Sequence, residues 1–327
     1  MRRREIIKLI GGAAAWPFVA RAQQSQQIRR IGNLTYYVES DPDVKLQLAA
    51  FEESLQKFGW TESHNIHIDN RFPAGKDQYQ PLARQLVAQQ PEVIFAESTP
   101  VTAALQRETR TIPIVFVAVS DPIGSGFVTS LARPGGNITG LLYYEASISG
   151  KWLALLKEIA PHLTRAALVA NPKTTPYDYF LRGAEAAAPS LAIELLQCPV
   201  DNAADIERVI ESVARIPNGG LVLPPDATTI VNRDLIISLA ARYRLPAVYA
   251  RRDFVAAGGL IAYSSDIIEQ TRQAASYVDQ ILRGANPAEL PVQAPTKFQT
   301  FVNLKTARTL GLDVPPLMLV RADEVIE

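Results

Sequence analysis

The chain has 327 residues, with 33 basic and 33 acidic side chains, and a single cysteine, Cys198. This charge balance, without a basic cluster, argues against a surface built for nucleic acid or anionic lipid. One cysteine excludes an intramolecular disulfide, so the fold has to be held by its hydrophobic core. Chains of this length usually divide into two domains, and we therefore expect two lobes.

Residues 1–22 have the pattern of an export signal. Three arginines, Arg2 to Arg4, precede the apolar run from Ile6 to Ala20, and Ala20-Arg21-Ala22 fits the small-x-small cleavage rule. The run RREIIK approximates the twin-arginine export pattern, and the general secretory route is the alternative. A membrane anchor is disfavoured because the apolar run is shorter than the roughly 20 residues that a spanning helix needs.

Cleavage after Ala22 would leave 28 basic and 32 acidic residues in the mature protein. No cysteine stands at the cleavage site to carry a lipid, so we expect no direct membrane anchor. The expected location is the periplasm, where the protein would diffuse freely as a monomer.

Short apolar runs alternate with amphipathic stretches along the mature chain, which is typical of βαβ units and parallel sheets. The break RPGGN at 133–137 separates two such series, and the strand predicted at 138–142 follows it. Before the break, we predict strands at 30–34, 66–71, 93–96 and 114–118, and helices at 44–58, 79–88 and 101–107. After the break, we predict helices at 150–160, 180–188, 204–215 and 229–243, and strands at 166–170, 193–197, 220–223 and 247–249.

Three segments, 137–143, 258–263 and 296–302, are predicted to pass between the lobes. The expected fold is therefore α/β, with two Rossmann-like lobes whose parallel sheets are joined by a three-segment hinge. The expected N-terminal lobe comprises residues 28–142 plus 262–295, and the C-terminal lobe residues 143–261 plus 296–327. Hinge closure over a ligand is a common property of such a design.

Several long segments resemble the ABC transporter substrate-binding family that includes tryptophan-binding receptors. They include PEVIFAESTP at 91–100, RPGGNITG at 133–140, FVAAGGLIAY at 254–263 and PTKFQTFVNLKTARTLGL at 295–312. The resemblance implies a type I periplasmic binding protein fold, a small-molecule ligand held between the lobes and a membrane permease as partner. It also implies an amino-acid-like ligand, since named relatives bind aromatic amino acids.

The candidate ligand-binding residues follow strands, because parallel sheets bind ligands at their carboxyl ends, where helix N-termini supply free N–H groups. Helix N-termini at Ser98-Thr99 and at Ser120 are expected to bind a carboxylate, and Asp226 of the other lobe an ammonium group. Each polar candidate could instead be an ordinary helix cap, and each tyrosine could simply pack between the lobes. The full set is Tyr36, Tyr37, Ser98, Thr99, Ser120, Asp121, Asn171, Asp226 and Tyr249.

The sequence shows no catalytic machinery. It contains no HExxH motif, no GxGxxG after the first strand, no phosphate-binding loop and no GxSxG elbow. Cys198 has no histidine near it in sequence and is expected to be an inert thiol. We predict no catalytic residue, no metal site and no cofactor, and a receptor of an ABC-type importer rather than an enzyme. A sensory receptor of the same fold and an exported α/β enzyme are the alternatives.

The signal gives a direct test of export. Replacing Arg3 and Arg4 by lysine should block export if the twin-arginine route is used, because that route reads the arginine pair itself. N-terminal sequencing of periplasmic protein should begin at Gln23, and a periplasmic protein that begins at Met1 would contradict the prediction. Unchanged export of the double variant would assign the general secretory route.

Overall fold

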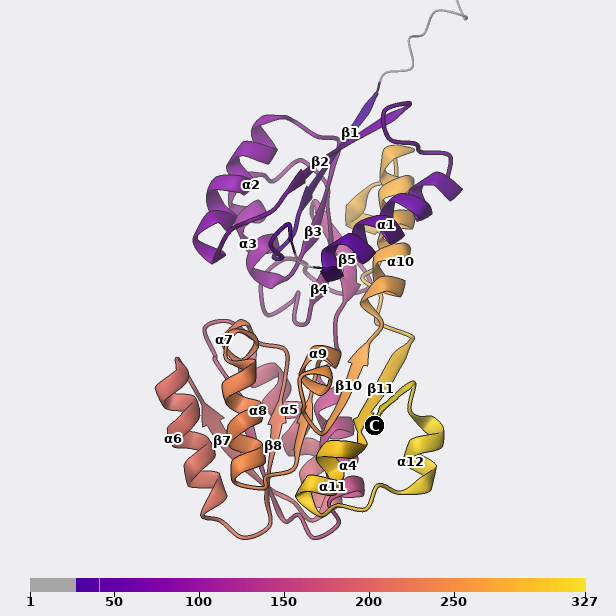
Figure 1. The fold of residues 1–327 in the computed structure, drawn as a ribbon. Helices are drawn as coiled ribbons and strands as arrows, with labels where there is room; N and C mark the ends of the chain where they lie inside the picture. Colours follow the sequence, from indigo (N-terminus) through magenta and orange to yellow (C-terminus); the bar gives the residue numbers. More distant parts are fainter. Residues whose placement is uncertain (1–27, 41) are drawn as a thin grey trace, which may run out of the picture.

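Two β-sheets, each covered by helices, divide the chain into two lobes (Figure 1). The computed structural model describes residues 28–40 and 42–327, so the expected export signal at residues 1–22 lies outside the described residues. Within the described ranges, no helix combines the length and apolar character needed to cross a bilayer. The predicted α/β class with two lobes is confirmed.

The first sheet has five parallel strands in the order β2-β1-β3-β4-β5. Its strands are nearly continuous apolar runs such as IVFVAV, because helices cover both faces. Helices α1 (Pro42–Lys57) and α10 (Ile267–Leu282) cover one face, and α2 (Tyr79–Ala88) and α3 (Thr99–Glu108) cover the other. The strands are β1 (Arg29–Leu34), β2 (Ile66–Arg71), β3 (Val93–Glu97), β4 (Ile114–Val119) and β5 (Ile138–Leu142).

The second sheet has seven strands in the order β12-β11-β10-β9-β8-β6-β7. Its strands are β6 (Arg165–Ala170), β7 (Glu194–Pro199), β8 (Gly219–Leu223), β9 (Ala247–Tyr249), β10 (Ile261–Ser265), β11 (Phe298–Asn303) and β12 (Glu324–Ile326). All pairs are parallel except β10 with β11, which is antiparallel.

The helices of the second lobe flank this sheet. They are α4 (Ile148–Ile159), α5 (Tyr177–Ala187), α6 (Ala203–Ala214), α7 (Ala227–Val231), α8 (Arg233–Arg242), α9 (Arg252–Ala256), α11 (Leu304–Leu310) and α12 (Pro316–Arg321). The single helix predicted at 229–243 is two helices that meet at Asn232. The Asn232 side-chain amide donates a 2.8 Å hydrogen bond to the Thr228 carbonyl, which satisfies a backbone group at the break.

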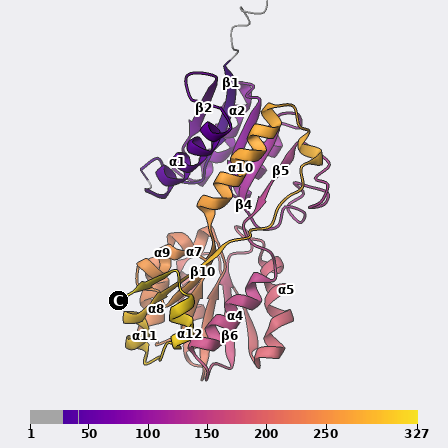
Figure 2. The same cartoon turned by 90° about the vertical axis from the view of Figure 1, so that its right-hand side faces the viewer.

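The chain crosses between the lobes three times (Figure 2). All of β5 pairs in the first sheet and all of β10 pairs in the second, so the crossings lie at 143–147, at 265–266 and at 294–297. The lobe boundary expected at residue 262 moves to the end of β10, because Ser265 still pairs with Phe298. The last two crossings lie side by side, joined by a 2.8 Å ion pair between Lys297 and Asp266.

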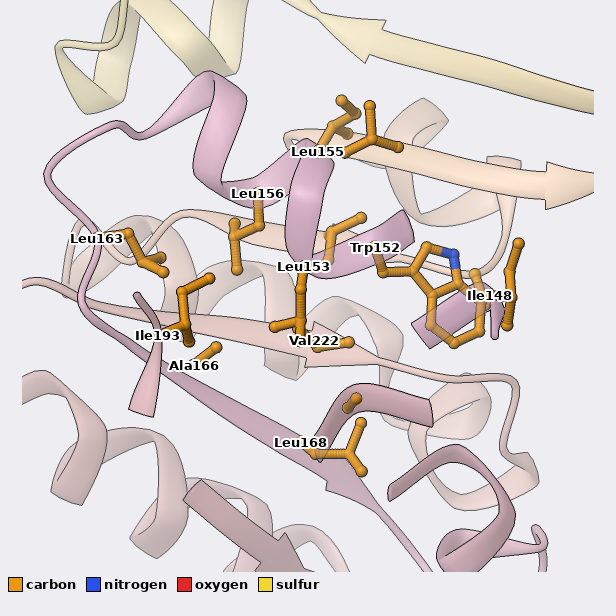
Figure 3. Close-up of a cluster of buried hydrophobic side chains, with 14 of the residues drawn as sticks. Ile148, Trp152, Leu153, Leu155, Leu156, Leu163, Ala166, Leu168, Ile193 and Val222 are labelled. Atoms are coloured by element: carbon orange, nitrogen blue, oxygen red, sulfur yellow. The ribbon is translucent and has the colours of Figure 1, made fainter. Parts of the chain in front are cut away.

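The core of the second lobe is centred on α4 (Figure 3). Trp152 is fully buried there, and its ring meets Tyr144 edge to face at 5.3 Å. Its indole N–H donates a 2.8 Å hydrogen bond to the carbonyl of Tyr263 in β10, as a buried tryptophan requires. Trp152 therefore joins α4 to the strand that leads into the second crossing.

Trp152→Ala should lower the free energy of unfolding by about 3–5 kcal/mol, because it opens a cavity and leaves the Tyr263 carbonyl without its donor. Denaturant unfolding followed by circular dichroism measures the change. Val231→Ala is the control, since the Val231 side chain is exposed and its loss should change little. Equal effects of the two substitutions would contradict this account of the core.

Candidate functional site

The carboxyl ends of β1 and β9 meet at the boundary between the lobes. Arg251 follows β9 of the second lobe, and its guanidinium donates a 3.1 Å hydrogen bond to the hydroxyl of Tyr36, which follows β1 of the first. A second hydrogen bond of 2.9 Å joins Arg251 to Asp253 at the start of α9. One side chain of the second lobe is thus placed directly against the first.

Three tyrosines lie within electrostatic range of the Arg251 guanidinium, which is itself largely buried. The rings of Tyr36 and Tyr37 lie 4.0 Å apart, and Tyr143 comes from the first crossing. Arg251 interacts electrostatically with all three phenols. Burial raises the pKa of Tyr37 to about 12 and that of Tyr36 as well, so both stay neutral and act as hydrogen-bonding aromatic surfaces. The rings of Tyr36 and Tyr37 thus lie together on the first lobe, and Arg251 of the second lobe contacts Tyr36.

The N-terminus of α3 is open. No side chain caps it, and the N–H groups of Thr99 and Val101 have no acceptor among the described residues. Ser98, just before the helix, has φ 90° and ψ 156°, a conformation that is nearly restricted to glycine and costs about 1–3 kcal/mol. Its hydroxyl is buried and finds no hydrogen-bond partner in the described part of the chain. Ser98 and Thr99 therefore present unused donors and the positive end of a helix dipole.

Glu97 is a buried acid that the sequence reading missed. It ends β3, is 3% exposed and accepts a hydrogen bond from the hydroxyl of Thr35. Burial raises the pKa of this carboxyl to about 7. The signal in the sequence was an acidic residue at the end of the apolar run VIFA, directly before the candidate Ser98.

The end of β4 differs from the expectation. No helix follows Ser120; residues 121–126 form a turn in which the Asp121 carboxylate accepts a 2.8 Å hydrogen bond from the Gly124 N–H. Pro122 and the positive φ of Gly126, 70°, favour a turn over a helix. The prediction of a helix N-terminus at Ser120 is therefore wrong. Ser120 is buried, and Asp121 serves as the cap of the turn.

Asp226 and Asn171 are tied into a polar network in the second lobe. The Asp226 carboxylate caps α7 through the Thr229 N–H at 2.9 Å, and it also accepts hydrogen bonds from the Asn171 N–H and the Thr174 hydroxyl. The Asn171 side chain donates to the Thr228 hydroxyl at 2.9 Å. Both Asp226 oxygens are already occupied, so the expected pairing of Asp226 with a ligand ammonium is not supported.

Tyr249 belongs to the core instead of the lobe boundary. It is 1% exposed, and its ring stacks on Phe254 at 4.8 Å. Arg251, two residues beyond the end of β9, is the residue that reaches the other lobe. The rule that located the other candidates, a polar residue just after a strand, would also have found Arg251.

The described part of the chain contains no group of three or more His, Cys, Asp or Glu side chains that could hold a metal ion. Burial raises the pKa of the Cys198 thiol to about 11, so it is protonated at neutral pH and a poor nucleophile. A cavity of about 430 Å³ lies within the second lobe, lined mostly by small residues such as Ala241, Gly258 and Thr306. It includes no residue of the first lobe.

Comparisons with known proteins agree with this two-lobed geometry. The family model described as ABC transporter substrate binding protein matches residues 33–326. A protein named Tyrosine-binding protein, from Clostridioides difficile (strain R20291), is 24% identical over 292 residues, which cover 86% of this chain and 82% of that protein.

Two solved structures are similar over both lobes. One, described as an ABC domain in complex with L-Trp from Streptococcus pneumoniae, has a TM-score of 0.83 and 22% identity, and covers 92% of this chain and 100% of that chain. The other, a conserved domain protein from Vibrio cholerae, has a TM-score of 0.82 and 26% identity, and covers 91% of this chain and 100% of that chain.

Glu97 predicts a pH dependence of stability. Its pKa is raised from an ordinary value of 4.5 to about 7 in the folded protein, which therefore favours the protonated form. The free energy of unfolding should fall by about 3 kcal/mol through this group as the pH rises from about 4.5 to about 7, and then level off. Unfolding curves of the ligand-free protein and of Glu97→Gln are recorded over this pH range. The difference between their free energies of unfolding isolates Glu97, because the contributions of the other carboxyl groups cancel. Parallel pH profiles of the two proteins would contradict the prediction.

Proposed function

Because this chain belongs to the ABC transporter substrate-binding protein family, we propose that it binds an aromatic amino acid between its lobes and delivers it to the membrane permease of an importer. The observation that carries the proposal is the meeting of Arg251 from one lobe with Tyr36 from the other. A ligand placed beside this pair touches both lobes. The protein acts after export to the periplasm, as a carrier and not as an enzyme.

The carboxylate of the ligand binds at the N-terminus of α3. The Ser98 hydroxyl and the Thr99 N–H donate to it, and the helix dipole stabilises its negative charge. Arg251, whose guanidinium forms charge-assisted hydrogen bonds with carboxylates, approaches from the second lobe. The strained backbone of Ser98 is then a device that directs its hydroxyl and the following amides toward the ligand.

The side chain of the ligand packs against the tyrosine cluster formed by Tyr36, Tyr37 and Tyr143. Aromatic rings gain from packing against one another in offset or edge-on geometry, so the cluster favours an aromatic ligand over an aliphatic one. The names of two relatives support this choice, since one is called a tyrosine-binding protein and another was solved with L-Trp.

Closure of the lobes accompanies binding. Three crossings of a few residues each connect the lobes, and such connections permit a hinge motion. A ligand that contacts both lobes only in the closed form shifts the equilibrium toward that form, which the permease then recognises. A sensory receptor would use the same site and differ in the docking partner alone.

Isothermal titration with L-tyrosine, L-tryptophan and L-phenylalanine tests the proposal. We expect at least one of them to bind, and Arg251→Gln to weaken it by roughly a hundredfold, because a buried carboxylate loses its charged partner. Arg208→Gln is the matched control, since Arg208 is exposed and forms an ion pair with Asp205 on its own helix. Failure of all three to bind, or equal affinities of the two variants, would contradict the proposal.

A further inference from the structure

We propose that Glu97 binds the ammonium group of the ligand, and that this contact selects amino acids over carboxylic acids that lack an amine. The inference rests on the proposed function, because it assigns the second charged group of the same ligand. It differs from the expectation that Asp226 has this role.

Glu97 is a buried acid without a cation. It takes part in no ion pair with a described residue, and its one hydrogen-bond partner is the neutral hydroxyl of Thr35. An isolated carboxylate is costly to bury, and it becomes favourable when a cation approaches it. The ammonium of a bound amino acid supplies such a cation at the carboxyl end of β3.

The face of the sheet on which Glu97 lies follows from strand alternation. Phe95, two residues earlier in β3, stacks on Phe51 of α1 at 4.6 Å, so Glu97 lies on the side that α1 and α10 cover. In a βαβ unit the helix runs antiparallel to its strands. Gln47, one turn before Phe51, therefore lies near the level of Glu97, since four helical residues and two strand residues both advance about 6 Å.

Polar atoms without partners gather at this end of the sheet. Within residues 28–40 and 42–327, the side-chain nitrogen of buried Gln47 has no hydrogen-bond partner. The same holds for the Oε1 atom of Gln270 and the hydroxyl of Thr271, both buried on α10. Gln270 is held at the sheet end because its amide donates a 3.0 Å hydrogen bond to the carbonyl of Leu142, the last residue of β5. The Oε1 atom of Gln270 and the hydroxyl of Thr271 are acceptors that suit an ammonium, which has three N–H donors, whereas the Gln47 nitrogen is a donor that suits the Glu97 carboxylate.

The opposite charges are arranged to suit a zwitterion. Glu97 belongs to the first lobe, whereas Arg251 comes from the second, and Tyr36 and Tyr37 follow the strand next to β3. Ser98, which offers its hydroxyl to the carboxylate, directly follows Glu97 in the chain. The two charged ends of an α-amino acid are separated by a single carbon, so adjacent positions for them are what the ligand requires.

The test compares L-tyrosine with 3-(4-hydroxyphenyl)propionate, which lacks only the amine, by titration of the wild type and Glu97→Gln. The wild type should prefer L-tyrosine by about a hundredfold or more, and Glu97→Gln should lose most of this preference without a change in its affinity for the propionate. Glu92→Gln is the matched control, since Glu92 lies at the other end of β3 and pairs with Arg29. It should keep the full preference.

A Glu97→Gln protein that keeps the preference of the wild type overturns the inference and leaves the proposed function intact. A wild type that binds both compounds equally overturns the inference in the same way. Binding of neither compound, nor of any aromatic amino acid, removes the proposed function and the inference with it. Thr35→Val distinguishes binding by the Glu97 carboxyl from a structural role of its hydrogen bond with Thr35, because the variant removes that hydrogen bond and keeps the carboxyl. If Thr35→Val lost the preference for L-tyrosine while Glu97→Gln kept it, the assignment to Glu97 would be overturned.

Discussion

The hydrogen bond between Arg251 and Tyr36 is the contact on which the site depends. It joins the carboxyl ends of two sheets that otherwise belong to separate cores. The buried Arg251 guanidinium has lost most of its hydrogen bonds to water. The Tyr36 hydroxyl and the Asp253 carboxylate replace some of these hydrogen bonds. In the proposed function a carboxylate ligand completes the set of partners, so affinity for the ligand and contact between the lobes would have the same physical origin.

The two lobes contribute differently to this arrangement. The first lobe supplies three features that lie together at the end of β3. They are the strained backbone of Ser98, the open N-terminus of α3 and the buried acid Glu97. The second supplies Arg251, which the start of α9 holds through Asp253. Buried groups that lack partners inside one lobe are a cost to stability, and a ligand that satisfies them recovers that free energy as binding.

The sequence predicted the fold better than the site. Alternating apolar and amphipathic runs located the strands β1 to β9, because parallel strands buried on two faces leave a strong pattern, whereas β12 was not predicted. The pattern could not predict that β10 belongs to the second lobe up to Ser265. This boundary depends on the pairing of Ser265 with Phe298, two residues that are distant in sequence. The rule that ligand-binding residues directly follow strands selected Ser98 as a candidate. The same rule could equally have selected Arg251 and Glu97.

Candidate residues that the structure places outside the lobe boundary share one physical reason. An aspartate after a strand can cap a helix or bind a ligand, and only its hydrogen bonds, as in Asp226, distinguish the two. A tyrosine at a strand end points either inward or outward, and Tyr249 points into the core. Residue type and spacing carry no information about partners that are distant in sequence, and these partners decide which candidates are free to bind.

The most direct measurement is a crystal structure of the protein with a bound aromatic amino acid. The account predicts the ligand between the lobes, with its carboxylate at Ser98, Thr99 and Arg251, and its ring against Tyr36 and Tyr37. A ligand in the cavity beside Gly258 and Thr306, or one held by a single lobe without contact to Arg251, would contradict it.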